Sequence, residues 1–180
     1  MTGALTQIPV GDPFDEQTLM GPVINQAACD RILGFVDRAR DAGSGKLLLG
    51  GDRLGGSLAD GYYVAPTVFG DVDNATEIAQ QEVFGPVLAV LRFSDEDEAV
   101  ALANDTEYGL AAYVHTRDLS RAIRVASALD AGNVGVNGGG AMGGPEAPFG
   151  GFKQSGYGRE GGKAGVLEFI RLKNVMVDLD

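Results

Sequence analysis

The sequence predicts an α/β fold in which crossover helices cover a mostly parallel, twisted sheet. The main observation is that residues 87–137 alternate apolar runs of strand length with helical patterns, an order that builds right-handed crossovers between parallel strands. In addition, 180 residues with 44% hydrophobic and 22% charged side chains suit one globular domain with a real core. Finally, glycines cluster after the last of these strands, where the functional loops of parallel sheets lie.

The first half of the chain divides into one clear helix and several short extended segments. Residues 1–24 should be irregular, because three prolines interrupt them. The expected elements are a helix over residues 25–41, strands over 46–49 and 62–69 with a turn region between them, and a weak helix over 74–81. The long helix is predicted because Cys29, Ile32 and Val36 recur on one face.

The second half supplies the strand–helix alternation. The expected elements are strands over residues 87–93, 111–115 and 133–137, and helices over 95–104 and 118–131. We expect Ser94 to cap the first of these helices, with Asp97 completing a capping box. Residues 167–180 alternate apolar and polar side chains, with a change of parity near Lys173 or Asn174 that indicates a bulge or bend. They are expected to form a terminal strand that pairs with another chain's sheet edge.

Charge excludes several classes of partner. The net charge is −11, and neither residues 1–90 (5 basic, 12 acidic) nor residues 91–180 (9 basic, 13 acidic) are basic. Such a chain is a poor electrostatic binder of nucleic acid, and an anionic membrane surface would repel it. No apolar run reaches the ~18 residues of a membrane helix, and the N-terminus does not resemble a secretory signal. We therefore expect neither nucleic-acid nor membrane partners.

Cysteine and histidine are scarce. The single cysteine, Cys29, excludes an internal disulfide and favours a reducing compartment, so we expect a cytoplasmic protein. Cys29 lies early in the predicted helix, a place that favours reactive thiolates, but its face is apolar, and we expect a small buried core residue. The single histidine, His115, lies on a predicted strand and is expected to be structural. No metal site is predicted, because Cys and His clusters are lacking.

Glycine is about twice as frequent as average, with 28 residues of 180. From Gly138 onward the glycines are too dense for one helix or a regular strand, so the tract should turn tightly as one or more loops. Gly156-Tyr157-Gly158 does not follow a strand and open a helix, as the dinucleotide fingerprint requires. A phosphate-binding loop and a nucleophile-elbow motif are also lacking.

Five sequence blocks together resemble the NAD(P)-dependent aldehyde dehydrogenases, in the family's order and at about its spacing. The blocks are residues 11–24 (GDPFDEQTLMGPVI), 61–69 (GYYVAPTVF), 81–87 (QEVFGPV), 104–110 (NDTEYGL) and 148–160 (PFGGFKQSGYGRE). The resemblance implies a covalent reaction: a cysteine thiolate attacks the aldehyde to give a thiohemiacetal, hydride passes to NAD or NADP, and water activated by a glutamate releases the carboxylic acid.

In the family, the nucleotide-binding domain, the general-base glutamate and the nucleophilic cysteine all precede the first block, which here begins at residue 11. The chain thus resembles a C-terminal portion, with residues 1–166 part of the catalytic domain and residues 167–180 an oligomerisation strand. We expect this chain alone to be inactive and to bind no cofactor. Two alternatives stay open: a non-catalytic oligomerisation module, and one half of a split enzyme whose N-terminal half is a separate polypeptide.

The resemblance assigns three site residues and no catalytic residue, since Cys29 does not match the nucleophile's motif. Glu82 matches the glutamate that hydrogen-bonds the nicotinamide ribose, and Phe84 matches a phenylalanine near the nicotinamide ring. Phe149 matches an aromatic residue near the substrate tunnel. Without the family, Glu82 would be read as a surface carboxylate and the two phenylalanines as core residues. Residues 138–145 occupy a segment that varies among the family's substrate loops, so the aldehyde is not specified.

Overall fold

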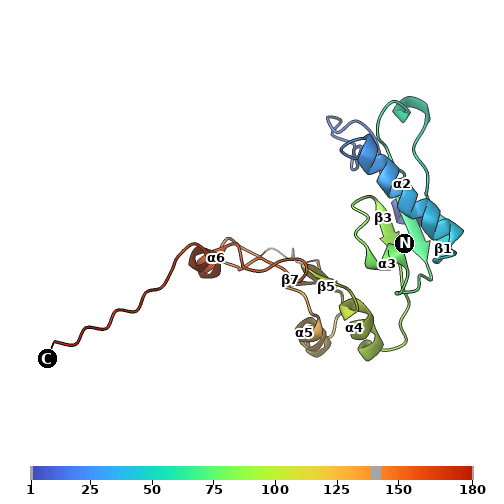
Figure 1. The fold of residues 1–180 in the computed structure, drawn as a ribbon. Coiled ribbons are helices and arrows are strands. Elements are labelled where there is room, and N and C mark those ends of the chain that lie inside the picture. The colour runs from blue at the N-terminus through green and yellow to red at the C-terminus, as the bar shows by residue number, and fades with distance from the viewer. Residues whose placement is uncertain (1, 139–142, 180) are drawn as a thin grey trace. The chain divides into compact units, whose positions relative to one another are not determined.

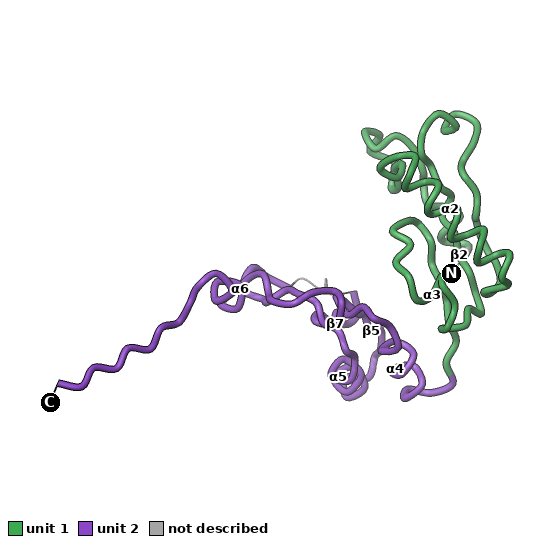
Figure 2. The backbone as a smooth tube through the Cα atoms, in the orientation of Figure 1, with its two compact units in different colours: residues 1–93 green, residues 94–180 purple. Residues whose placement is uncertain are grey.

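The computed structural model describes residues 2–138 and 143–179, which form two compact units, residues 1–93 and residues 94–180 (Figures 1 and 2). Each unit contains its own hydrogen-bonded strands and its own covering helices. Residues 139–142, in the middle of the glycine-rich tract, lie outside the described residues.

Unit 1 is a three-stranded mixed sheet covered by one long helix. Its elements are α1 (Thr2–Leu5), α2 (Gln26–Asp41), β1 (Lys46–Leu49), the 3-10 turn η1 (Gly56–Leu58), β2 (Thr67–Gly70), α3 (Glu77–Gln80) and β3 (Val87–Ala89). The strand order is β1–β2–β3, with β1 antiparallel and β3 parallel to the central strand β2. The predicted strands are thus confirmed, although β2 and β3 are shorter than expected.

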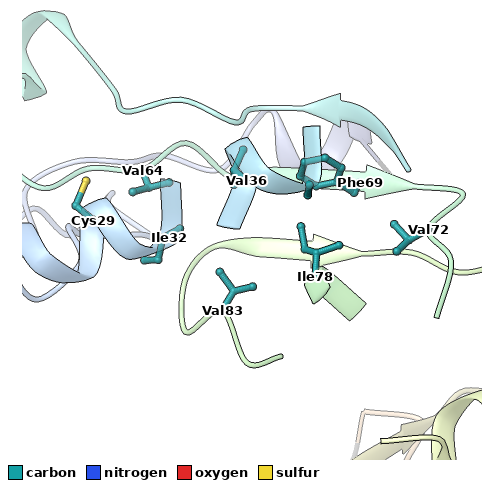
Figure 3. Close-up of a cluster of buried hydrophobic side chains, with 9 residues drawn as sticks. Cys29, Ile32, Val36, Val64, Phe69, Val72, Ile78 and Val83 are labelled. Atoms are coloured by element: carbon teal, nitrogen blue, oxygen red, sulfur yellow. The ribbon is translucent and has the colours of Figure 1, made fainter. Parts of the chain in front are cut away.

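Helix α2 begins and faces the sheet for reasons visible in its sequence. Asn25 is extended, and its side-chain oxygen accepts a hydrogen bond from the N–H of Ala28 at 2.8 Å, which satisfies one of the helix's free donors. The recurring apolar face of α2 is buried against the sheet (Figure 3). The predicted helix over residues 25–41 is confirmed to within one residue.

The core of unit 1 is a single apolar cluster. Its buried members are Cys29, Ile32, Val36, Ala39, Val64, Phe69, Val72, Ile78 and Val83. Thr67 is also buried, at 2% exposed, but its hydroxyl donates to the carbonyl of Ala65 (2.8 Å) and accepts from the N–H of Gly51 (2.9 Å). The buried hydroxyl is therefore satisfied and costs the core little.

Unit 2 holds two small sheets and three helices among its described residues. Its elements are α4 (Glu96–Asn104), β4 (Tyr108–Gly109), β5 (Ala111–Val114), α5 (Leu119–Ala128), β6 (Asn133–Val136), β7 (Phe152–Lys153) and α6 (Gly162–Glu168). Strands β5 and β6 are parallel with α5 as their crossover, whereas β4 and β7 are antiparallel. The predicted α/β class with parallel strand pairs is confirmed, but β3, expected in one sheet with β5 and β6, pairs with β2 in unit 1 instead.

The cap of α4 corrects the sequence prediction by one residue. Asp95, not Ser94, is the N-cap: its carboxylate accepts from the N–H of Glu98 at 2.9 Å. Glu98, not Asp97, reaches back, and it accepts from both the N–H and the hydroxyl of Ser94 at 2.6 Å. Asp95 prevails because its extended backbone places the carboxylate over the first turn, where the helix dipole also favours negative charge.

The C-terminal segment differs from expectation at its start. Leu167 and Glu168, predicted to begin a strand, belong to helix α6. Residues 170–179 have no assigned helix or strand, and their side chains are exposed. A terminal strand over residues 170–180 therefore stays a prediction that depends on a partner's sheet edge.

Candidate functional site

The segment from Gln81 to Pro86 connects α3 to β3 and carries two of the three predicted site residues. Its central residue, Val83, is only 8% exposed and belongs to the apolar core of unit 1 (Figure 3). The carbonyl of Pro86 accepts a hydrogen bond from the N–H of Thr67 on β2 at 2.8 Å. The segment is therefore fastened to the unit at its middle and at its end.

Helix α2 provides two further attachments. The guanidinium of Arg31 donates to the carbonyl of Val83 and, at 3.4 Å, to the carbonyl of Phe84. Gly85 lies so close to Ile32 that a β-carbon on it would be 2.5 Å from the Cδ1 atom of that fully buried side chain. The backbone of this segment thus packs directly on α2, which only glycine permits at that position.

This anchoring turns Glu82 and Phe84 outward. Glu82 is exposed, and Phe84 is 77% exposed even though its neighbour Val83 is buried. Phe84 also adopts the left-handed backbone region, with φ of 49°, which costs a non-glycine residue about 1–2 kcal/mol. An exposed aromatic ring held in a strained conformation by its surroundings is typical of a binding site. The loop brings a carboxylate and an aromatic ring together on one anchored segment.

The short helix before the loop is itself tied to α2. Arg38 forms two hydrogen bonds with the carboxylate of Glu77, at 2.8 and 3.0 Å, in a forked geometry. These hydrogen bonds hold the pKa of Glu77 below its ordinary value. Both side chains are about half exposed, so the pair contributes modestly to stability and chiefly ties the first residue of α3 to α2.

The third predicted site residue, Phe149, lies in unit 2 on the glycine-rich tract. Its N–H and its carbonyl pair with the carbonyl and the N–H of Glu160, at 2.8 and 2.7 Å, as in a short antiparallel bridge. The side chain of Phe149 is half-buried. Arg159 donates to the carbonyls of Gly151 (3.1 Å) and Gly158 (2.6 Å), which closes this part of the tract into a loop. The predicted tight turning is confirmed for the described residues, and the predicted variable segment 138–145 lies partly outside them.

An open hollow of about 700 Å³ lies on this loop. Its lining comprises Glu107, Gly151, Phe152, Lys153, Gln154, Gly156, Tyr157, Gly158 and Arg159. The guanidinium of Arg159 stacks over the ring of Phe152 at 5.3 Å, and Lys153 pairs with Asp130 at 3.2 Å. Both cationic side chains that line the hollow, Lys153 and Arg159, are therefore already paired with other residues of the chain.

Cys29 is fully buried in the core of unit 1, as predicted, and does not face a cleft.

His115 is exposed and lies at the carboxyl ends of β5 and β6, where it lines an open hollow of about 720 Å³ with Asn137. Asn137 accepts from the N–H of Thr116 and donates to its carbonyl, both at 2.9 Å, so its amide joins the two strand ends. Among residues 2–138 and 143–179, no group of three or more His, Cys, Asp or Glu side chains is placed to hold a metal ion.

Sequence reasoning misses the residue that holds the loop. The helical pattern places Arg31 only on the polar face of α2, yet its guanidinium bonds to carbonyls 52 and 53 residues away. Such a pattern shows which face a residue occupies but not which distant loop passes beneath it. The family-like block QEVFGPV signals that the loop matters, without naming what fixes it.

Comparison with known proteins identifies the class. The sequence model of the aldehyde dehydrogenase family matches residues 1–175, so the chain belongs to the aldehyde dehydrogenase family. Betaine aldehyde dehydrogenase of Cereibacter sphaeroides is 47% identical over 173 residues, which are 96% of this chain and 35% of that protein. An aldehyde dehydrogenase of Emericella nidulans is 46% identical over 166 residues, covering 92% of this chain and 32% of its own.

Solved structures agree. The chain resembles a Mycobacterium tuberculosis aldehyde dehydrogenase complexed with NAD⁺, with a TM-score of 0.88 and 40% identity over 93% of this chain and 34% of that one. It resembles equally, at a TM-score of 0.88 and 43% identity, a mutant aldehyde dehydrogenase C of Pseudomonas syringae in complex with NAD⁺ and octanal, again over 93% and 34%. This chain thus spans about a third of the length of these relatives. Among residues 2–138 and 143–179, none of the helices combines the length and the hydrophobicity that a membrane span requires.

Proposed function

We propose that this chain supplies the C-terminal third of an NAD(P)-dependent aldehyde dehydrogenase, which oxidises an aldehyde to a carboxylic acid through a thiohemiacetal. The observation that carries the proposal is the anchored segment from Gln81 to Pro86, which presents Glu82 and Phe84 outward. In this role the carboxylate of Glu82 accepts hydrogen bonds from the two hydroxyls of the nicotinamide ribose, because an ionised carboxylate is an acceptor with two oxygens. Phe84 packs its ring near the nicotinamide.

The residues present suit that cofactor. Glu82 is exposed, so its carboxylate is available to a sugar diol, and Phe84 offers an apolar face beside it. The backbone between them is fixed by Arg31, Val83 and Gly85, so binding need not order the loop. NAD or NADP, when bound, accepts the hydride; these residues orient the nicotinamide end and exclude water from it.

Three further assignments belong to the same proposal. Phe149 lies beside the aldehyde's side chain in the complete enzyme, and residues 1–166 contribute to its catalytic domain. Residues 167–180 join neighbouring subunits, with a strand formed from the exposed part after α6. The buried free thiol of Cys29 suits a reducing compartment such as the cytoplasm.

We further propose that these 180 residues do not turn over aldehyde unaided, since their only thiol, Cys29, is 0% exposed. The purified chain with an aldehyde and NAD should yield no NADH above a chain-free control. Turnover by the chain alone, lost in a Glu82→Gln variant, would overturn this part of the proposal.

A chimera tests the positive part. The first two thirds of Cereibacter sphaeroides betaine aldehyde dehydrogenase, joined to this chain, should oxidise betaine aldehyde with NAD. Glu82→Gln should then raise KM for NAD about tenfold or more, because a hydrogen bond to a charged group is worth about 1.5–3 kcal/mol. Asp60→Asn, which removes another exposed carboxylate of unit 1, should leave KM unchanged. A folded chimera in which both variants behave alike would refute the role of Glu82.

One observation supports a second candidate function, a non-catalytic oligomerisation module. Large apolar side chains of the C-terminal segment are almost fully exposed, among them Leu172 (89%), Met176 (87%) and Leu179 (90%). Light scattering at micromolar concentration should show an oligomer that deletion of residues 171–180 converts to a smaller species. A monomer with or without that deletion would refute both this module and the proposed subunit strand.

A split enzyme is tested with the same two parts. The relative's N-terminal two thirds and this chain, expressed together as separate polypeptides, should copurify and oxidise betaine aldehyde if the halves assemble without a covalent link. Activity in the fused chimera alone would exclude the split arrangement.

A further inference from the structure

Asn133, at the start of β6, has a buried side chain that hydrogen-bonds the backbone next to Phe149. Asn133 is only 8% exposed, and its amide nitrogen donates to two carbonyls, those of Leu110 and Gly150, each at 3.0 Å. A primary amide has two N–H donors, so Asn133 uses both of them to join distant parts of unit 2. One part is the junction of β4 and β5, and the other is the glycine-rich tract.

Gly132, the residue before Asn133, leaves room for the Gly150 carbonyl to approach the Asn133 amide. A β-carbon on Gly132 would lie 1.8 Å from the carbonyl oxygen of Gly150, closer than any real contact. The N–H of Gly132 donates to the carbonyl of Gly109 at 2.9 Å, which fixes its backbone from the other side. The Gly150 carbonyl therefore packs against the backbone of Gly132 and accepts a hydrogen bond from the Asn133 amide.

Pairing of the strands does not by itself require this amide. Ala111 and Asn133 are already partners in the parallel β5–β6 register through their backbones. A small or apolar side chain at position 133 would preserve that pairing but would leave the carbonyls of Leu110 and Gly150 without the Asn133 donor. The amide thus adds a connection between strand β6 and the tract, which the sheet alone does not provide.

We propose that Asn133 is a positioning residue for Phe149: by holding the carbonyl of Gly150, it fixes the backbone from which the Phe149 ring projects. The Glu160 backbone holds Phe149 through the other edge of the same segment, at 2.8 and 2.7 Å. The segment is thus held on one side by β6 and on the other by the end of its own loop. The proposal rests on the proposed function for the statement that Phe149 meets the aldehyde, and on unit 2 alone for the statement that Asn133 fixes it.

The first experiment places a reporter at the segment itself. The chain contains no tryptophan, so Phe149→Trp introduces a single indole emitter. In that background, Asn133→Leu should raise the acrylamide quenching constant of the introduced indole about twofold and shift its emission to longer wavelength. The matched control is Asn104→Leu, because the Asn104 side chain also bonds backbone in unit 2, at Ala128 (2.8 Å) and Asp130 (2.7 Å), but none on this tract. The backbone carbonyl of Asn104, which accepts from Lys153 of the tract, is kept in this variant.

The second experiment leaves Phe149 in place. Amide hydrogen exchange in the 180-residue chain should become about tenfold faster at Phe149 and Glu160 in Asn133→Leu, as expected for the loss of about one net hydrogen bond. The amides of β5 and β6 should change less than those two. Uniform acceleration throughout unit 2, or no change at Phe149, would mean that Asn133 only stabilises the unit and would overturn the proposal.

Two further variants keep the test decisive if Asn133→Leu does not fold. Asn133→Ser has one donor on a shorter side chain and cannot serve both carbonyls, so it should loosen Phe149, though less than Asn133→Leu, while preserving unit 2. Gly132→Ala keeps the amide but pushes the Gly150 carbonyl away, so it should loosen Phe149 as Asn133→Leu does. A folded Gly132→Ala or Asn133→Ser variant with wild-type exchange at Phe149 would count against the proposal.

The chimera separates this inference from the proposed function. There, Asn133→Leu should raise KM for the aldehyde severalfold, with KM for NAD unchanged, because Phe149 and not Glu82 is displaced. If exchange at Phe149 accelerates but KM for the aldehyde stays constant, Asn133 is confirmed as a positioning residue and the substrate role of Phe149 fails.

Discussion

Removal of the Arg31 guanidinium should loosen the segment that carries Glu82 and Phe84 while leaving the core of unit 1 intact. The appropriate change is Arg31→Met, because methionine preserves the unbranched stem and the helix propensity of this α2 position. The carbonyls of Val83 and Phe84 would then lose their shared donor. Arg31 is exposed on the outer part of α2, so no buried cavity is created.

The size of the effect follows from two opposing contributions. A hydrogen bond from a charged donor stabilises by about 1.5–3 kcal/mol, and the exposure of Arg31 places it at the lower end; the 3.4 Å bond to Phe84 adds little. The left-handed backbone of Phe84 costs about 1–2 kcal/mol, which the guanidinium helps to offset. The free energy lost with the Arg31 hydrogen bond is similar to the cost of the left-handed Phe84 backbone. In Arg31→Met the native conformation of the loop should therefore no longer dominate, and other conformations should be populated beside it.

Nuclear magnetic resonance can observe this change directly. The HN–Hα coupling constant of Phe84 depends on φ, and it should move from the value for φ near 49° toward a conformational average. Relaxation of the backbone nitrogens at residues 82 and 84 should indicate added motion. The backbone nitrogen of Val83 should gain less motion than those two, because the Val83 side chain is held by the apolar core rather than by Arg31.

A second arginine of α2 serves as the control. Arg40 also donates to a backbone carbonyl, that of Gly51 at 3.3 Å, but this carbonyl lies outside the Glu82 segment. Arg40→Met should therefore leave the coupling constant of Phe84 unchanged. If Arg31→Met leaves it unchanged as well, the loop is fixed by Val83 and Gly85 alone, and the reasoning about Arg31 is wrong.

Two other changes test the packing of unit 1. Lys46 and Arg92 hydrogen-bond the carboxylate of Asp71, with Lys46 at 3.0 Å, and hold its pKa below the ordinary value. The ionised carboxylate thus stabilises the fold above its ordinary pKa of about 3.9, and that stabilisation is lost as pH falls through the lowered pKa. Asp71→Asn should therefore lower the urea midpoint at pH 7 and converge with the unsubstituted chain toward about pH 2; a constant difference would contradict the ion pairing. Gly85→Ala should destabilise by about 1–3 kcal/mol in urea unfolding, because its β-carbon meets the fully buried Ile32; an unchanged midpoint would show that the core can yield there.

The elements are predictable from sequence where one residue's neighbours in the chain decide its state. Helix α2 shows a repeated apolar face and an N-cap at Asn25, both local features, and its predicted bounds agree to within one residue. The predicted cap of α4 is wrong because Ser94, Asp95, Asp97 and Glu98 all offer capping oxygens within a few residues. Pattern alone cannot rank these competitors, since the backbone angles at Asp95 decide which oxygen faces the free N–H groups.

The candidate site is predictable only as far as its outward-facing residues. Glu82 and Phe84 stand in a family-like block, so their identity points to a cofactor, and the prediction awaits its test. The residues that hold such groups are harder to find, because Arg31 and Asn133 act on backbone carbonyls that any sequence provides. Because every residue has a backbone carbonyl, the sequence does not indicate which carbonyls Arg31 and Asn133 will bind.

The glycines near Arg31 and Asn133 mark the places where their segments pack most closely. Gly85 and Gly132 are placed where another backbone or a buried side chain leaves no room for a β-carbon, at 2.5 Å and 1.8 Å. Each lies beside a polar anchor: Gly85 follows the carbonyls bound by Arg31, and Gly132 precedes Asn133. Close approach and hydrogen bonding thus act together at both sites, since each glycine lets its segment pack closely beside the polar side chain that binds a carbonyl. Replacing the glycine and replacing the donor should therefore disturb the same segment at each site, whereas two unrelated defects would disturb different ones.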